Sequence, residues 1–186
     1  MTALDLSREH LRHTSQHLAA EGLATTAVYG DAEAMPFPGD SFDLVYAFGV
    51  LHHTPNTAAA ITEIHRVLRS GGTAIVGLYH RNSLFFWTKI LYRGIYKGGL
   101  LNGWRRFLST IEYRSDPCAA TPLVKVYGRH QVRRLFRMFP RVLIETRHVS
   151  SGLAGLFQKL MCWPAEEAER RLGKWGWYII VHATKA

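Results

Sequence analysis

Residues 30–53 read GDAEAMPFPGDSFDLVYAFGVLHH, and this stretch decides the fold. Its centre, Phe42 to Phe48, is a short apolar run with Pro38-Gly39-Asp40 before it and Gly49 after it, which is the pattern of a buried strand. Polar residues follow this run, and they also follow a shorter strand-like run from Ala27 to Tyr29. Ligands bind at the carboxyl ends of parallel strands. The stretch therefore predicts two strand ends that carry ligand-binding loops.

Strands and helices also alternate on both sides of this stretch. Ala3-Leu4 predicts a strand that ends at Asp5, and Ser7 can cap a helix that should stop at Gly22. A helix from Thr57 to Leu68, which Gly71-Gly72 should terminate, precedes a buried strand from Thr73 to Tyr79. This alternation predicts a parallel sheet with helices on both faces.

The second half of the chain is less regular. Asn82 to Pro122 is aromatic, basic and interrupted by glycine, and we interpret it as an inserted lid of one or two helices. A helix from Gly128 to Phe139 follows, and Val142 to His148 and Trp177 to Thr184 have the composition of strands. We expect three parts: a core over residues 1–80, a lid over 81–127 and the end of the sheet over 128–186.

Charge is distributed unevenly along the 186 residues. Residues 1–80 hold 4 basic and 8 acidic side chains, whereas residues 81–186 hold 19 basic and 6 acidic ones. The basic part is expected to face an anionic partner. The two cysteines, Cys118 and Cys162, fit no disulfide framework and no CxxC spacing, which indicates a reducing compartment. With no apolar span and no signal-like N-terminus, we expect a cytoplasmic protein.

Five short motifs occur in order along the chain. They are Ala3-Leu4-Asp5-Leu6-Ser7, Gly30-Asp31-Ala32-Glu33-Ala34-Met35-Pro36-Phe37, Phe42-Asp43-Leu44-Val45, Leu51-His52-His53 and Arg66-Val67-Leu68-Arg69-Ser70-Gly71-Gly72. Together they resemble the class I S-adenosylmethionine-dependent methyltransferases, in particular the group that includes ubiquinone and menaquinone biosynthesis methyltransferases. The resemblance is good from Ala3 to Tyr79 and weaker from Tyr127 to Thr184. It implies a Rossmann-like α/β sheet, methyltransferase activity and S-adenosyl-L-methionine as cofactor.

The resemblance also implies where this methyl donor binds. The expected donor-binding residues are Asp5, Leu6, Gly30, Asp31, Ala32, Phe48, Gly49 and Leu51. Asp5 would hold the ribose hydroxyls, Leu6 would pack on the adenine, and Asp31 with the backbone of Ala32 would bind the adenine edge. The residues from Phe48 to Leu51 would line the methionine portion. From its sequence context alone, Asp5 could equally be a surface residue in a turn.

One departure from the family pattern is large. The first strand of the family and its glycine-rich loop should precede Ala3, yet the sequence begins at Met1. That strand lies in the centre of the sheet, where its loss would leave backbone groups unpaired. We therefore expect a truncated or mis-started methyltransferase that by itself binds the donor poorly. Translation upstream of Met1 should then reveal an apolar strand and a glycine-rich turn.

Three histidines are candidates for a catalytic base. Methyl transfer from a sulfonium needs few catalytic side chains, but a hydroxyl or acidic carbon acceptor must lose a proton. Histidine titrates near neutral pH. In order of preference the candidates are His53, His52 and His80, all of which follow expected strands. A histidine pair can also have a purely structural role.

The segment from Leu84 to Lys97 is expected to face the acceptor. Basic residues recur every four positions at Lys89, Arg93 and Lys97 among aromatic and aliphatic ones. This pattern fits a helix at an anionic membrane interface, and it also fits a helix packed on the sheet with a solvated basic stripe. Either would suit a small acceptor that is apolar or lipid-like, and the first would make the protein membrane-peripheral.

Other functions have weaker support in the sequence. A nicotinamide-dependent Rossmann enzyme could share Asp5, but the Leu51-His52-His53 junction fits a methyltransferase better. A nucleic-acid-binding module would explain the basic half, yet no zinc-finger or RNP-type motif accompanies it. A non-catalytic fragment that binds an anionic surface is the main alternative to an enzyme. His10, His13 and His17 share one helical face, which we interpret as solvated rather than as a metal site.

Overall fold

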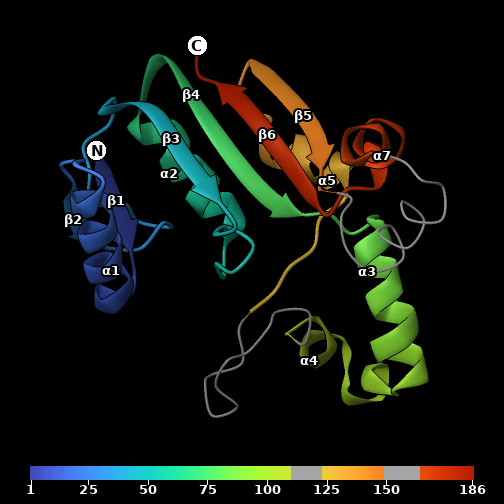
Figure 1. The fold of residues 1–186 in the computed structure, drawn as a ribbon. Helices are drawn as coiled ribbons and strands as arrows, with labels where there is room; N and C mark the ends of the chain where they lie inside the picture. Colours follow the sequence, from blue (N-terminus) through green and yellow to red (C-terminus); the bar gives the residue numbers. More distant parts are fainter. Residues whose placement is uncertain (110–122, 149–163) are drawn as a thin grey trace.

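The computed structural model describes residues 1–109, 123–148 and 164–186, which form two sheets with flanking helices (Figure 1). Strands β1 (Thr2–Asp5) and β2 (Thr26–Tyr29) pair in parallel.

The second sheet has the order β3-β4-β6-β5. Its strands are β3 (Phe42–Phe48), β4 (Leu68–Tyr79), β5 (Arg141–Arg147) and β6 (Tyr178–Thr184). β3 runs parallel to β4, and β6 runs antiparallel to β4 and β5. The expected α/β fold is confirmed.

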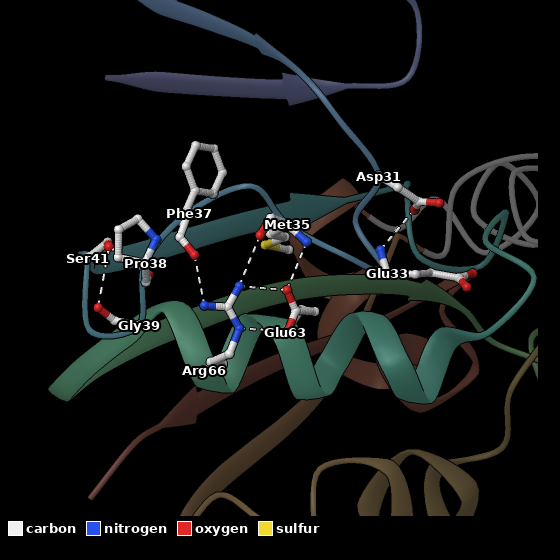
Figure 2. A network of polar contacts seen from close by, with 9 residues as sticks. All are labelled: Asp31, Glu33, Met35, Phe37, Pro38, Gly39, Ser41, Glu63 and Arg66. Carbon is white, nitrogen blue, oxygen red and sulfur yellow. Dashed lines mark hydrogen bonds and ion pairs between the residues drawn. The ribbon is translucent and has the colours of Figure 1, made fainter.

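The two sheets present unpaired edges to each other. β1 and β3 are edge strands in the part of the chain that the structure describes, and they point in the same direction (Figures 1 and 2). Leu44 and Tyr46 of β3 are 56% and 67% exposed. No described strand lies between β1 and β3, so their facing backbone groups make no ladder with each other.

Helix α1 (Arg8–Ala20) connects the two strands of the smaller sheet. It begins where expected, because the hydroxyl oxygen of Ser7 accepts a hydrogen bond from the His10 amide at 3.2 Å. Gly22 follows the helix with a φ of +72°, a conformation that favours glycine. The helix thus returns the chain to β2, whose register places Tyr29 opposite Asp5.

Helix α2 (Thr57–Val67) forms the centre of the larger core against β4 (Figure 1). Its residues Ala60, Ile61, Ile64 and Val67 follow helical spacing and are fully buried. The helix ends at Val67, one residue before the expected end at Leu68, but the expected start of the next strand at Thr73 is wrong by five residues. β4 already begins at Leu68, which is fully buried and pairs with Phe42 of β3. The pairing of Leu68 with Phe42 thus starts the strand before Gly71 and Gly72, where the local sequence predicts a turn.

Beyond β4 the chain forms a helical arm, defined here as residues 84–109. It contains α3 (Leu84–Lys89), the π-helical turn η1 (Ile90–Tyr96), the 3-10 turn η2 (Gly99–Asn102) and α4 (Trp104–Ser109). These elements agree with the helices expected for the lid, whose remaining residues, 110–122, lie outside the described part of the chain, as do Cys118 and Cys162.

The C-terminal part contains α5 (Arg129–Leu135), α7 (Ala165–Leu172) and the 3-10 turn η3 (Gly173–Trp175). α5 ends four residues earlier than expected, because a turn from Phe136 to Phe139 replaces its last part. Both phenylalanines are nevertheless buried in the core. Among the helices that the structure describes, none is long and apolar enough to cross a membrane.

Candidate functional site

The carboxyl ends of β1 and β2 are joined at the point where the sequence predicts a nucleoside site. The Gly30 amide donates a hydrogen bond to the carbonyl oxygen of Asp5 at 3.2 Å, directly after the pair Asp5–Tyr29. A side chain on Gly30 would meet Leu4 and Pro36, with its Cβ 2.8 Å from Leu4 Cδ1. The lack of a side chain therefore allows the loop after β2 to pass close to β1.

A cavity of about 460 Å³ opens between β1 and β3, next to these strand ends. Four of the expected donor-binding residues line it, namely Asp5, Ala32, Phe48 and Leu51. The lining also includes Leu4, Met35, Phe37, Val45 and Val50, so it is largely apolar. An apolar cavity with a carboxylate at its border is suited to a nucleoside.

The Asp5 carboxylate is partly committed to its own loop. Its Oδ1 accepts a hydrogen bond from the Ser7 amide at 2.7 Å and lies 3.7 Å from His10 Nδ1. Its Oδ2 makes no hydrogen bond with another residue in the described ranges. The carboxylate is therefore oriented by the backbone and retains an oxygen that can accept from a ribose hydroxyl.

Asp31 and Leu6 are less clearly part of the cavity. Asp31 Oδ1 accepts a hydrogen bond from the Glu33 amide at 2.9 Å, which shapes the loop after β2 (Figure 2). Leu6 is exposed. Asp31, Leu6 and Gly49 are adjacent in sequence to lining residues, but neither they nor Gly30 line the cavity. Their expected contacts with the donor remain predictions.

An ion pair on α2 holds the loop that follows Asp31 (Figure 2). Glu63 Oε2 accepts from the Met35 amide at 2.8 Å, and Arg66 donates to the carbonyl oxygens of Met35 and Phe37 at 3.0 and 2.8 Å. Glu63 and Arg66 contact each other at 2.7 Å. The hydrogen bond from Arg66 lowers the pKa of Glu63, although partial burial opposes this effect. No local sequence signal indicates the role of this pair, because its loop partners lie 28 to 31 residues away.

Glu33 connects this loop to the loop after β3. Its Oε1 accepts a hydrogen bond from the Asn56 amide at 2.5 Å. Asn56 in turn caps α2, because its side-chain oxygen accepts from the Ala59 amide at 3.2 Å. The two loops expected to bind the donor are therefore fixed relative to each other, a role that the sequence analysis did not assign to Glu33.

His52 lies in the core of the site. Its side chain is fully buried, its ring centroid is 3.7 Å from that of Tyr79, and neither nitrogen makes a hydrogen bond within the described residues. Burial, with a smaller contribution from His53, lowers the pKa of His52 to about 3. His52 is therefore neutral near pH 7 and is a weak base.

His53 is more accessible and is oriented by a distant segment. Its Nδ1 lies 2.6 Å from the carbonyl oxygen of Leu123, and a carbonyl oxygen can only accept, so Nδ1 carries the proton. In the neutral ring Nε2 is then the basic nitrogen. The adjoining backbone is held by the amide of Lys125, which donates to the His52 carbonyl oxygen at 3.1 Å.

His80 occupies a third, distinct environment. It is 2% exposed, and its Nδ1 donates to the carbonyl oxygen of Gly176 at 3.0 Å. Burial lowers the pKa of His80, although the hydrogen bond to Gly176 opposes this effect. Among the three candidate bases, accessibility and orientation favour His53.

Three further polar groups near the histidines were not anticipated. Thr57 Oγ1 lies 2.8 Å from the hydroxyl of Tyr127, and Lys125 Nζ lies 3.3 Å from the same threonine oxygen. Burial raises the pKa of Tyr127 and lowers that of Lys125. About 70 residues separate Thr57 from its two partners, so no local sequence signal could have identified this cluster.

The histidines of α1 make separate pairwise contacts. His10 lies near Asp5, while His13 Nε2 lies 3.8 Å from Glu9. Among the residues that the structure describes, no three metal-binding side chains are grouped.

Comparison with known proteins shows which proteins the chain resembles. Residues 1–76 match the family described as "Methyltransferase domain". A rice (Oryza sativa subsp. japonica) protein named 2-methyl-6-phytyl-1,4-hydroquinone methyltransferase 2 is 38% identical over 81 residues, which are 43% of this chain and 23% of that protein. Demethylmenaquinone methyltransferase of Geobacillus kaustophilus is 25% identical over 154 residues, or 82% of this chain and 64% of that protein. The chain thus spans less than two thirds of these relatives.

Solved structures show the same fold over the whole chain. A SAM-dependent methyltransferase from Methanosarcina mazei matches with a TM-score of 0.61 at 17% identity, over 99% of this chain and 81% of that one. A Thermotoga maritima structure, described as a SAM-dependent methyltransferase and possible histamine N-methyltransferase, matches with a TM-score of 0.60 at 15% identity, over 100% and 72%. Residues 1–76 thus resemble a methyltransferase domain, and the chain shares its fold with solved S-adenosylmethionine-dependent methyltransferases.

Proposed function

We propose that this protein transfers a methyl group from S-adenosyl-L-methionine to a small, lipid-like acceptor. The observation that carries the proposal is the meeting of Asp5, Ala32, Phe48 and Leu51 at one cavity. These residues lie at the ends of β1 and β3 or in the loops after β2 and β3, and the resemblance assigns all of them to the donor. The alternative, a non-catalytic module that binds an anionic surface, is not favoured by the methyltransferase relatives.

The site can position a nucleoside in the following way. Asp5 Oδ2 would accept from a ribose hydroxyl, while the backbone of Ala32 and the carboxylate of Asp31 would face the adenine edge. The apolar side chains of Phe48 and Leu51 would exclude water from the methionine portion. When bound, the donor supplies a methyl group on a sulfonium, and transfer leaves S-adenosylhomocysteine.

His53 is the residue that we propose as general base. A new bond forms between the methyl carbon and the acceptor atom while the bond from sulfur to this carbon breaks, and an acceptor hydroxyl or acidic carbon loses a proton. Nε2 of His53 would take that proton, because Nδ1–H is held by the Leu123 carbonyl oxygen. His52, buried and neutral, would instead form part of the wall beside Tyr79.

The proposed acceptor class is a prenylated aromatic ring, such as a hydroquinone. Two of the relatives carry names of enzymes for such substrates. In this chain, the rings of His52, Tyr79 and Trp177 form an aromatic cluster. Tyr79 contacts His52 and stacks on Trp177, with 4.3 Å between the ring centroids of Tyr79 and Trp177. The cluster reaches the arm through Phe85 and Phe86. An acceptor with an apolar tail also fits our proposal that residues 84–97 contact a membrane peripherally from the cytoplasm.

The test combines donor binding with transfer. Calorimetric titration with S-adenosylhomocysteine should show binding to the wild-type chain. Radiolabelled methyl groups should then pass from S-adenosyl-L-methionine to a prenylated hydroquinone dispersed in detergent. Absence of binding would contradict the proposal, whereas binding without transfer would contradict the acceptor class.

A further inference from the structure

The arm presents an unusual surface for a protein in water. Seven large apolar side chains on it are at least about half exposed, namely Trp87, Leu91, Tyr92, Ile95, Tyr96, Leu101 and Trp104. Leu101 is 92% exposed and Tyr96 is 78% exposed. Figure 1 shows α3 extending from the end of β4 away from the larger sheet, with α4 beside the far end of this helical segment. Grouped exposure of this kind indicates an interaction site.

The arm is anchored at its base. Phe86, Phe107 and Leu108 are buried together with Tyr79 and Trp177 in a second hydrophobic cluster. Some apolar side chains of the arm therefore attach it to the sheet, while the seven named above are exposed among the described residues.

Close backbone contacts hold the two halves of the arm together. A Cβ on Gly94 would lie 3.1 Å from Leu100 Cγ, and one on Gly99 would lie 2.5 Å from the carbonyl oxygen of Arg93. Because both positions are glycine, the segment around η2 can pack directly on η1. Leu101 and Trp104 therefore lie on the same arm as Tyr92 and Tyr96. The exposed apolar surface of the arm thus extends beyond residues 84–97, the segment with the regular spacing of basic residues.

All charged side chains on the arm are positive. Residues 84–109 contain Lys89, Arg93, Lys97, Arg105 and Arg106 and no acidic residue. Four of these five, all except Lys89, are exposed. Lys89 lies over the ring of Phe85 at 4.9 Å, and Lys97 lies 5.7 Å from the ring centroid of Tyr96. Cationic groups next to exposed aromatic rings complement the phosphate and acyl boundary of an anionic bilayer.

We propose that the arm is a two-part membrane anchor, in which Leu101 and the aromatic side chains of η1 and α4 enter the acyl boundary of an anionic bilayer while Arg93, Lys97, Arg105 and Arg106 contact lipid phosphates. This inference deepens the proposed function and rests on it for its purpose, because a lipid-like acceptor is dissolved in the bilayer. The binding itself requires neither donor nor acceptor.

The proposal is tested by co-sedimentation of the full chain with vesicles of phosphatidylcholine, with and without about 30 mol% phosphatidylglycerol. Wild type should bind the anionic vesicles at least about tenfold more tightly than the neutral ones, and this preference should weaken at high salt. Equal binding to both vesicles, or no binding, would overturn the proposal. Binding to RNA with no binding to vesicles would also overturn it and would assign the basic surface to nucleic acid.

Two pairs of variants locate the surface. Leu101→Asp should weaken vesicle binding at least about tenfold, whereas Leu23→Asp, at an exposed leucine after α1, should not. Arg105→Glu with Arg106→Glu should weaken it similarly, whereas Arg133→Glu with Arg134→Glu, an exposed pair on α5, should have a much smaller effect. Equal losses in test and control variants would contradict the proposed location. Circular dichroism verifies that each variant is folded.

A further measurement separates this proposal from the proposed function. Leu101→Asp should transfer methyl groups to a detergent-dispersed acceptor as wild type does, and should lose transfer only when the acceptor is in vesicles. Vesicle binding by a wild type without transferase activity would support the anchor and contradict the enzyme. Activity without vesicle binding would support the enzyme and contradict the anchor.

Discussion

The carbonyl oxygen of Asp5 accepts a hydrogen bond from the Gly30 amide at 3.2 Å. This contact continues the parallel ladder of β1 and β2 and holds the loops after the two strands together. It places the Asp5 carboxylate and the loop of Ala32 beside one cavity, which Phe48 and Leu51 line from β3 and its loop. The proposed donor site depends on this arrangement.

Asp5→Ala should weaken the binding of S-adenosylhomocysteine about 10- to 100-fold, because a hydrogen bond to a charged group contributes roughly 1.5–3 kcal/mol. Calorimetric titration measures this change. Glu9→Ala is a matched control, since Glu9 is an exposed acid on the adjacent helix and pairs with His13. Equal affinities of Asp5→Ala and wild type would remove Asp5 from the site.

His53→Ala should reduce kcat by about 10²- to 10⁴-fold, the usual contribution of a general base, and should leave donor affinity nearly unchanged. His53→Gln separates positioning from proton transfer, because an amide can accept a hydrogen bond but cannot take up the proton. Its rate should stay as low as that of His53→Ala. Unchanged turnover in either variant would exclude His53 as the base.

His52→Phe should change how stability depends on pH. Burial keeps the pKa of His52 near 3 in the folded protein, below its ordinary value of 6.5. The neutral His52 side chain therefore contributes fully to the free energy of unfolding above pH 6.5, and this contribution is lost as the pH falls toward 3. Between pH 6.5 and pH 3 the free energy of unfolding decreases by up to about 1.4 kcal/mol per pH unit because of His52. Urea unfolding at several pH values should show wild type losing stability relative to His52→Phe as pH decreases. Parallel pH profiles would contradict this prediction.

Glu63→Ala should lower Tm by roughly 3–6 °C, because the Met35 amide and Arg66 both lose their carboxylate partner. It should also weaken donor binding, since the loop that carries Ala32 would be less well held. Thr62→Ala is the control, at an exposed neighbour on α2. Thermal unfolding and calorimetry measure both effects, and equal results for the two variants would argue against a role for the Glu63–Arg66 pair.

Local signals predicted much of the fold and part of the site. The strand Phe42–Phe48 has the expected bounds, because turn residues precede it and Gly49 follows it. The Ser7 cap is likewise confirmed, since its hydrogen bond joins residues three positions apart. Asp5, Ala32, Phe48 and Leu51 line one cavity, and their contacts with the donor stay a prediction.

What the sequence could not show depends on contacts between distant residues. β4 starts at Leu68 because it pairs there with Phe42, which the glycines at 71 and 72 do not reveal. The orientation of His53 depends on Leu123, and the buried state of His52 depends on Tyr79. Neither periodicity nor spacing encodes such contacts. The second half of the arm was also missed as part of its surface, because glycine packing joins η2 to η1.

The central claim is that one nucleoside bridges the loops after β1 and β2. A crystal structure of the complex with S-adenosylhomocysteine tests it most directly. We predict that the ribose hydroxyls lie within hydrogen-bonding distance of the Asp5 carboxylate and that the adenine lies beside Asp31 and Ala32. Electron density for the nucleoside elsewhere on the protein, with no contact to Asp5, would contradict the account.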